Sequence, residues 1–238
     1  MNQLVEILES ALVFALIAGV FVAVFVLSRR GRKKNQQTAD GYAELARVAQ
    51  ENGWAYAPQA YGRIDQYCGA AAMPGSGSGL RAWHHTTGEL RGRSFTFFEH
   101  RYVNPGSTHE AGEARTPTVN AIFVVTAPGS APSLEILQPR KLDAVLDRRE
   151  RTEIGVAEFD AKFRVVTSDE GFARNVLDGT VVPFLLTDSR AASSPLQLRG
   201  DELFTWYQGA VSPAAVEEKL NFLCDVLDRI PAQSWSTA

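Results

Sequence analysis

Seventeen consecutive residues near the start of the chain, Ala11–Leu27, carry no charge and no strong hydrogen-bonding side chain. With their neighbours they form an apolar stretch over residues 7–28, which as a helix would rise ~33 Å and cross a hydrocarbon core of ~30 Å. In lipid, a single segment can satisfy its own backbone hydrogen bonds only as a helix. The stretch therefore predicts one N-terminal transmembrane helix, with the lipid bilayer as its partner.

The charges on the two sides of this stretch predict its orientation. Glu6 and Glu9 lie before the uncharged run Ala11–Leu27, near the N-terminus of the expected helix, and five basic residues follow the stretch: Arg29, Arg30, Arg32, Lys33 and Lys34. A cleaved signal peptide has the opposite arrangement, with its positive charge first. Because basic flanks stay on the cytoplasmic side, we expect a single-pass plasma-membrane protein with its N-terminus outside and its C-terminal domain in the cytoplasm.

Small residues recur at every fourth position of the apolar stretch: Ala11, Ala15, Gly19 and Ala23. Such a stripe lets two helix backbones approach closely, which suggests a homodimer through the membrane helix. The alternative is that apolar helices are simply rich in alanine.

The rest of the chain has the composition of a globular domain. We divide the 238 residues into a transmembrane segment (1–28), a basic juxtamembrane link (29–38) and a cytosolic domain (39–238). After residue 34 the net charge is −6, and an acidic body argues against nucleic acid as a partner, because phosphate contacts need a basic face. Two cysteines do not require an oxidising compartment.

The sequence of the domain predicts a set of strands between terminal helices. Arg81–Leu90 and Arg93–Val103 flank Arg91-Gly92 and predict a hairpin, whose second strand changes phase in a way that indicates a bulge or burial of both faces. Further strands are predicted at Thr118–Ala127 and Ser133–Leu137, with a second hairpin turning at Gly200-Asp201 between Leu196–Arg199 and Glu202–Gln208.

Helices are predicted at both ends and in the interior of the domain. They cover Asp40–Asn52, Lys141–Arg149, the residues after Ser168 or Asp169, a short helix with Pro183 near its start, and a last helix capped by Ser212. Because strands and helices do not alternate regularly, the fold class is α+β with a largely antiparallel sheet and flanking helices, following the membrane helix.

Several segments resemble a known group of sequences. LARVAQENGWAYAP, GELRGRSFTFFEHRY and FDAKFRVVTSDEGFARNVL occur in the order found in uncharacterised actinobacterial single-pass membrane proteins, and the likeness covers roughly residues 40–230. An FxxxFxV…D…A…L pattern is also similar to a broader bacterial family of unknown function, and its members here are Phe159, Phe163, Val165, Asp169, Ala173 and Leu177. The resemblance implies a membrane-anchored cytosolic domain and no catalytic residue.

One polar cluster is a candidate site. The predicted hairpin brings His100 and Glu99 close to His84 or His85, and adjacent His84 and His85 point to opposite faces, so one of them at most joins a shared site. A zinc site needs three converging ligands, and ordinary polar positions on a strand explain these histidines more simply. No recognised catalytic motif is present, and no cofactor or metal is expected.

Four arginines, Arg81, Arg91, Arg93 and Arg101, lie on the same predicted hairpin. They suggest either a surface for anions or lipid headgroups, or a solvated strand face. The function predicted from these features is a non-enzymatic, membrane-anchored cytosolic module that binds an unknown protein partner or the membrane surface. The alternatives are an enzyme with a site assembled from scattered residues, and an extracytoplasmic envelope or sensor domain if the topology is reversed.

Overall fold

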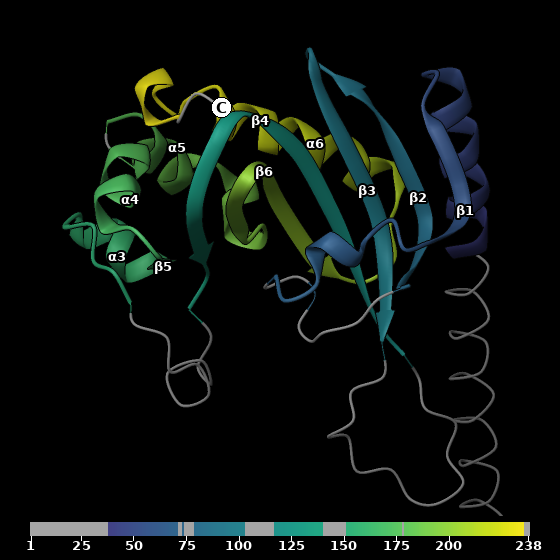
Figure 1. Cartoon of the computed structure of the whole chain (residues 1–238), viewed down its shortest axis with the longest axis horizontal. Coiled ribbons are helices and arrows are strands. Elements are labelled where there is room, and N and C mark those ends of the chain that lie inside the picture. The colour runs from purple at the N-terminus through teal and green to yellow at the C-terminus, as the bar shows by residue number, and fades with distance from the viewer. Residues whose placement is uncertain are drawn as a thin grey trace, which may run out of the picture. The chain divides into compact units, whose positions relative to one another are not determined.

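The computed structural model describes residues 38–70, 73, 79–102, 117–139, 151–177 and 179–235. The chain divides into two compact units, Met1–Ala43 and Glu44–Ala238. Of the first unit, only the helical residues 38–43 are described. All the described strands belong to the second unit (Figure 1).

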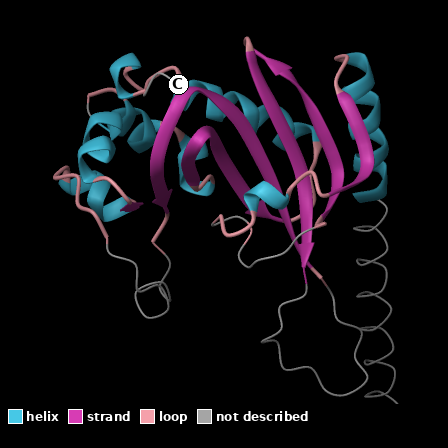
Figure 2. Ribbon diagram, viewed as in Figure 1, coloured by secondary structure: helices cyan, strands magenta, loops and turns pink. Residues whose placement is uncertain are grey.

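The second unit is an α+β fold built on an antiparallel sheet (Figure 2). Its described strands are β1 Ala55–Tyr61, β2 Arg81–Leu90, β3 Arg93–Tyr102, β4 Thr118–Leu137, β5 Arg164–Thr167 and β6 Leu196–Gln208. Its described helices are residues 44–51, α3 Ala157–Lys162, α4 Glu170–Leu177, α5 Val181–Thr187 and α6 Pro213–Leu227. Short 3₁₀ turns are η1 Asp65–Tyr67, η2 Ser189–Ser193 and η3 Ala232–Ser234.

The long strand β4 organises the sheet. Along one edge it pairs with β6 over nearly its whole length. Along the other edge its first half pairs with β3 and its second half with β5. The order β1-β2-β3-β4-β5 therefore has β6 as a branch on β4, and every pairing is antiparallel.

Side chains cover both faces of the sheet. On one face, α6 packs across β3, β4 and β6, and Trp54 lies edge-on against Phe95, with their ring centroids 4.9 Å apart. On the other face, the segment after β1 places Tyr67 in a stack on Phe98, with ring centroids 5.5 Å apart. The phase change predicted in the second hairpin strand is thus burial of both faces, since β3 pairs with β4 without a register shift.

Several local predictions are confirmed. The first hairpin turns at Arg91 and Gly92, both of which have positive φ. Asp169 accepts a hydrogen bond from the Phe172 N–H at the start of α4, and Ser212 caps α6. The predicted helix Lys141–Arg149 lies outside the described residues.

Two pairs of predicted strands are each one strand. The sequence predicted a break after Ala127 and a hairpin at Gly200-Asp201, and both predictions are wrong, because β4 and β6 continue through these points. Gly200, with φ +59°, lies opposite Ala131, and the register between the two strands shifts on both sides of Ala131. The glycine and proline residues between Ala127 and Ser133 in β4, and Gly200 in β6, therefore mark an irregularity that the two paired strands share. They do not mark two turns.

The membrane part of the predicted fold class needs correction. Among the described helices, none combines the length and the apolar character needed to cross a membrane. Helix α6, for example, has 15 residues, whereas a span needs ~20. The stretch that had suggested a span, residues 7–28, lies outside the described residues, as do the small-residue stripe and the basic cluster.

Candidate functional site

The predicted polar cluster is split between the two faces of the sheet. A register shift between Trp83 and Thr86 places His84 in a left-handed conformation, with φ +53°. This irregularity turns the His84 ring toward β1, where its Nδ1 lies 2.8 Å from the hydroxyl oxygen of Tyr56. His85 lies on the opposite face and stacks on Phe98.

Glu99 lies on the same face as Tyr56 and is fully buried. Its Oε1 accepts a hydrogen bond of 2.9 Å from the Val211 N–H, and its Oε2 accepts two from the Arg101 guanidinium. His100, the next residue along β3, points to the other face and stacks on Tyr102. The structure therefore groups His84 with Glu99, and separates both from His85 and His100.

The electrostatics of this cluster favour a structural role. Burial lowers the pKa of His84, and the charge of Glu99 only partly opposes the shift, so the imidazole is neutral near pH 7. Burial raises the pKa of Tyr56, and Glu99 raises it further. Both oxygens of Glu99 already accept hydrogen bonds: the bond from Val211 to Oε1 fixes β3 to the segment before α6, and the bonds to Oε2 come from Arg101 of β3 itself. Nowhere in the described part of the chain do three His, Cys, Asp or Glu side chains converge as a set of metal ligands.

A groove that the sequence analysis did not find lies among α3, α4 and α5. Its volume is about 600 Å³. Apolar side chains line much of it: Ile154, Val156, Leu177, Val182, Pro183 and Leu186. Polar side chains also line it: Glu158, Arg174, Asn175 and Thr187. We call this feature the α3–α5 groove.

One wall of the groove is the loop of residues 154–156, which side chains of α3 and α4 hold in place. The Asp160 carboxylate accepts hydrogen bonds from the Ile154 N–H at 3.0 Å and the Gly155 N–H at 2.9 Å. Arg174 donates to the carbonyl oxygens of Glu153 and Ile154. These bonds hold the apolar side chains of Ile154 and Val156 in place, and Val156 is 40% exposed.

A second wall of the groove is α5, whose sequence VVPFLLT contains one polar residue. Val181, Val182 and Leu185 are buried, whereas Pro183 is exposed and Leu186 half-buried in the groove. A helix that is apolar all round is normally buried on every side. This composition was the signal in the sequence that could have pointed to the groove.

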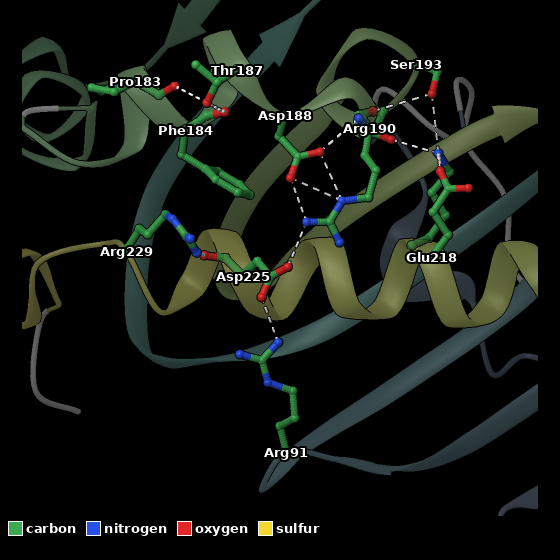
Figure 3. Close-up of polar contacts among 12 residues, drawn as sticks. Arg91, Pro183, Phe184, Thr187, Asp188, Arg190, Ser193, Glu218, Asp225 and Arg229 are labelled. Carbon is green, nitrogen blue, oxygen red and sulfur yellow. Dashed lines mark hydrogen bonds and ion pairs between the residues drawn. The ribbon is translucent and has the colours of Figure 1, made fainter.

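The four arginines of the β2–β3 hairpin have different surroundings. At the turn, Arg91 pairs with Asp225 of α6 (Figure 3), and both Arg91 and Arg93 pair with Asp228 at the end of that helix. At the other end of the hairpin, Arg101 pairs with Glu99, and Arg81 lies over aromatic rings. The turn arginines are therefore neutralised by carboxylates and do not form an anion surface.

The comparisons with known proteins bear on the fold. No family model matches the chain, and no curated protein matches it. A solved structure, that of the mycobacterial trehalose monomycolate transport factor A, TtfA, is similar, with a TM-score of 0.57 and 14% sequence identity. The match covers 84% of this chain and 97% of that chain. The resemblance to actinobacterial single-pass proteins and the predicted localisation stay predictions. At this level of identity the similarity shows that the two chains share a fold.

Proposed function

We propose that this protein is a non-catalytic factor in the transport of an envelope lipid, and that its α3–α5 groove holds an apolar chain of that lipid. The observation that carries the proposal is the groove itself. It leaves apolar side chains of α5 and of the 154–156 loop accessible, among them Val156, which is 40% exposed. Ligand sites are typically concave, about 300–1,000 Å³ in volume, and mostly apolar with a few polar groups.

The polar residues of the groove suit an amphipathic ligand. Glu158, Arg174 and Thr187 are exposed, whereas Leu177 and Val182 are buried. An acyl chain would cover the apolar surface, while a hydroxyl-rich or charged headgroup would stay near the polar side chains and water. Because burial of an apolar chain supplies ~25 cal/mol per Å², binding would depend mainly on the chain rather than on the headgroup.

The fold similarity supports the same class of function. The structurally similar protein is named as a transport factor for trehalose monomycolate, and nearly all of that chain is matched. The sequence predicted a module that binds a protein partner or the membrane surface. The present proposal is more specific, because it names a lipid as the bound molecule. An unknown protein partner remains a separate prediction.

Photo-crosslinking in cells tests this proposal with the full-length chain. Cells that express the chain are given a fatty acid carrying a diazirine, irradiated, and the labelled peptides are identified by mass spectrometry. Label in peptides from residues 151–187 is expected, because they line the groove. Label confined to other peptides would overturn the proposal.

Matched variants separate groove binding from general lipid contact. Leu186→Glu places a charge on the apolar wall and should abolish most of the label in these peptides, since burying an unpaired charge is costly. Ser189→Glu adds the same charge at an exposed position of η2 outside the groove and should leave the label unchanged. Equal labelling of both variants would contradict the assignment of the groove, and limited proteolysis checks that each variant is folded.

A further inference from the structure

A second surface lies at the opposite end of β2 and β3 from their turn. Tyr61 ends β1, Arg81 begins β2, and Arg101 is the penultimate residue of β3. Tyr61 pairs with Arg81, and Trp83 pairs with Glu99, two positions before Arg101. Alternation along the strands therefore places these side chains on one face, and we call Tyr61, Arg81, Trp83 and Arg101 the aromatic–arginine surface.

The four side chains form a continuous stack. The Arg81 guanidinium carbon lies 4.6 Å from the centroid of the Tyr61 ring and 5.4 Å from that of the Trp83 ring. The Arg101 guanidinium carbon lies 4.3 Å from the Trp83 ring centroid. Buried Glu99 anchors Arg101 through two hydrogen bonds, so the stack rests on a fixed base.

Arg101 of this surface pairs with Glu99, but the surroundings of Arg81 differ from those of the arginines at the hairpin turn. Arg91 and Arg93 are neutralised by carboxylates of Asp225 and Asp228. By contrast, none of the carboxylates in the described ranges lies within ion-pair distance of Arg81, and its side chain is exposed. An exposed guanidinium that is stacked on aromatic rings keeps its N–H edges directed outward, where they match the oxygens of a phosphate.

We propose that the aromatic–arginine surface binds the anionic phospholipid headgroups of a membrane. Arginine supplies the contact with phosphate, and a basic residue near an anionic membrane contributes ~1 kcal/mol. Tryptophan and tyrosine favour the depth of the headgroups, because each ring has an apolar body and a polar tip. Tyr61 is 60% exposed, which is high for a large hydrophobic side chain. A free phosphate ion would use the arginine but not the rings, so the combination favours a lipid surface.

Fluorescence quenching tests this proposal on the full-length chain. The chain is added to phosphatidylcholine vesicles with or without phosphatidylglycerol, in which the lipids carry bromine near the headgroup end of the acyl chains. Brominated phosphatidylglycerol should quench tryptophan emission more strongly than brominated phosphatidylcholine. The Trp83→Phe variant should lose this difference in quenching between the two lipids, because Trp83 is the tryptophan of the aromatic–arginine surface.

Arginine variants and salt complete the test. Arg81→Gln should weaken the response to phosphatidylglycerol about fivefold, the factor that corresponds to ~1 kcal/mol, and high salt should weaken it in the unmodified chain. Arg199→Gln, which removes an exposed arginine of β6 outside this surface, should behave like the unmodified chain. Equal quenching by the two lipids, or no effect of Arg81→Gln, would overturn the proposal.

A last control distinguishes binding of a lipid headgroup from binding of a free phosphate ion. Inorganic phosphate at millimolar concentration should not change the emission of Trp83 when no lipid is present. A change equal to that caused by phosphatidylglycerol would assign the surface to a free anion and overturn the membrane proposal. The inference does not depend on the α3–α5 groove, so Leu186→Glu should leave the quenching intact whether or not the groove binds lipid.

Discussion

Arg91 and Asp225 join the turn of the β2–β3 hairpin to the closing helix, with Nη1 of Arg91 2.8 Å from Oδ1 of Asp225. The other oxygen of Asp225 accepts a hydrogen bond of 2.7 Å from Arg190, in the η2 turn (Figure 3). Arg190 in turn is bound by Asp188 and lies over the ring of Phe222. One carboxylate thus links three segments that are far apart in the sequence.

Replacing Asp225 with asparagine should destabilise the fold by about 1–2 kcal/mol, because two charge-assisted hydrogen bonds in a partly buried network are lost. Burial alone would raise the pKa of Asp225, but the bonds from Arg91 and Arg190 outweigh it and leave the pKa below its usual value. The stabilisation is therefore present above the unfolded-state pKa of ~3.9 and is lost as pH falls through the lower folded-state value.

Urea unfolding at pH 7 and at an acidic pH below the folded-state pKa of Asp225 measures this effect. The difference between Asp225→Asn and the unmodified chain should be largest at pH 7 and shrink in acid, where both side chains are neutral. Asp201→Asn changes an exposed residue in β6 and serves as the control. A difference that persists unchanged in acid would show that packing, rather than charge, explains the loss.

Gly88 makes room for the Trp54 ring. A Cβ atom at Gly88 would lie 2.5 Å from Cδ1 of Trp54 and 2.8 Å from Cζ of Phe95. Gly88→Ala should therefore displace the indole and reduce the free energy of unfolding by about 2–3 kcal/mol, within the range for overpacking. In a Trp54→Ala background the same change should cost much less, and a double-mutant cycle by urea unfolding measures the coupling. Additive costs would contradict this assignment.

Local sequence signals predicted the elements that are formed by neighbouring residues. The first hairpin, the cap of α6 and the apolar faces of α4 and α6 depend on short-range patterns, and these agree with the structure. The same signals failed where a long-range pairing decides the outcome. Gly200 is a normal turn residue in isolation, but pairing with the irregular region around Ala131 keeps it within a strand.

The candidate sites show the same limit. The hairpin register predicted from the sequence places Glu99 near a histidine but does not say which one. The register shift between Trp83 and Thr86 in β2 makes His84 the histidine on the side of Glu99. The groove depends on α3, which the sequence analysis did not predict, and on a loop held by Asp160. The apolar composition of α5 is visible in the sequence, whereas the neighbours that leave part of it accessible are not.

Asp160 offers a test of the groove that does not alter its lining. Asp160→Ala removes both acceptors for the Ile154 and Gly155 N–H groups, so the loop wall should loosen. The label from the diazirine fatty acid in peptides from residues 151–187 should fall several-fold. Asp160→Asn keeps one oxygen acceptor and should give an intermediate result. Full labelling of the alanine variant would show that the groove does not depend on this wall.

Buried histidines should make the fold sensitive to mild acid. Burial lowers the pKa of His84, His85 and His100 in the folded protein, so the unfolded chain binds protons more readily. The stability that the neutral rings provide is complete above the unfolded-state pKa of ~6.5 and is lost as pH falls through the folded-state values. The free energy of unfolding should therefore be lower at pH 5.5 than at pH 7.5.

His100→Phe isolates one of these contributions. Nδ1 of His100 is buried without a hydrogen-bond partner among the described residues, and its ring stacks on Tyr102. Phenylalanine keeps the aromatic ring and removes the unpaired nitrogen, which should raise the stability at pH 7.5 by about 1 kcal/mol. The decrease between pH 7.5 and 5.5, measured by urea unfolding, should also become smaller. If the variant loses as much stability in acid as the unmodified chain does, His100 does not contribute to the acid sensitivity, and the remaining histidines must account for it.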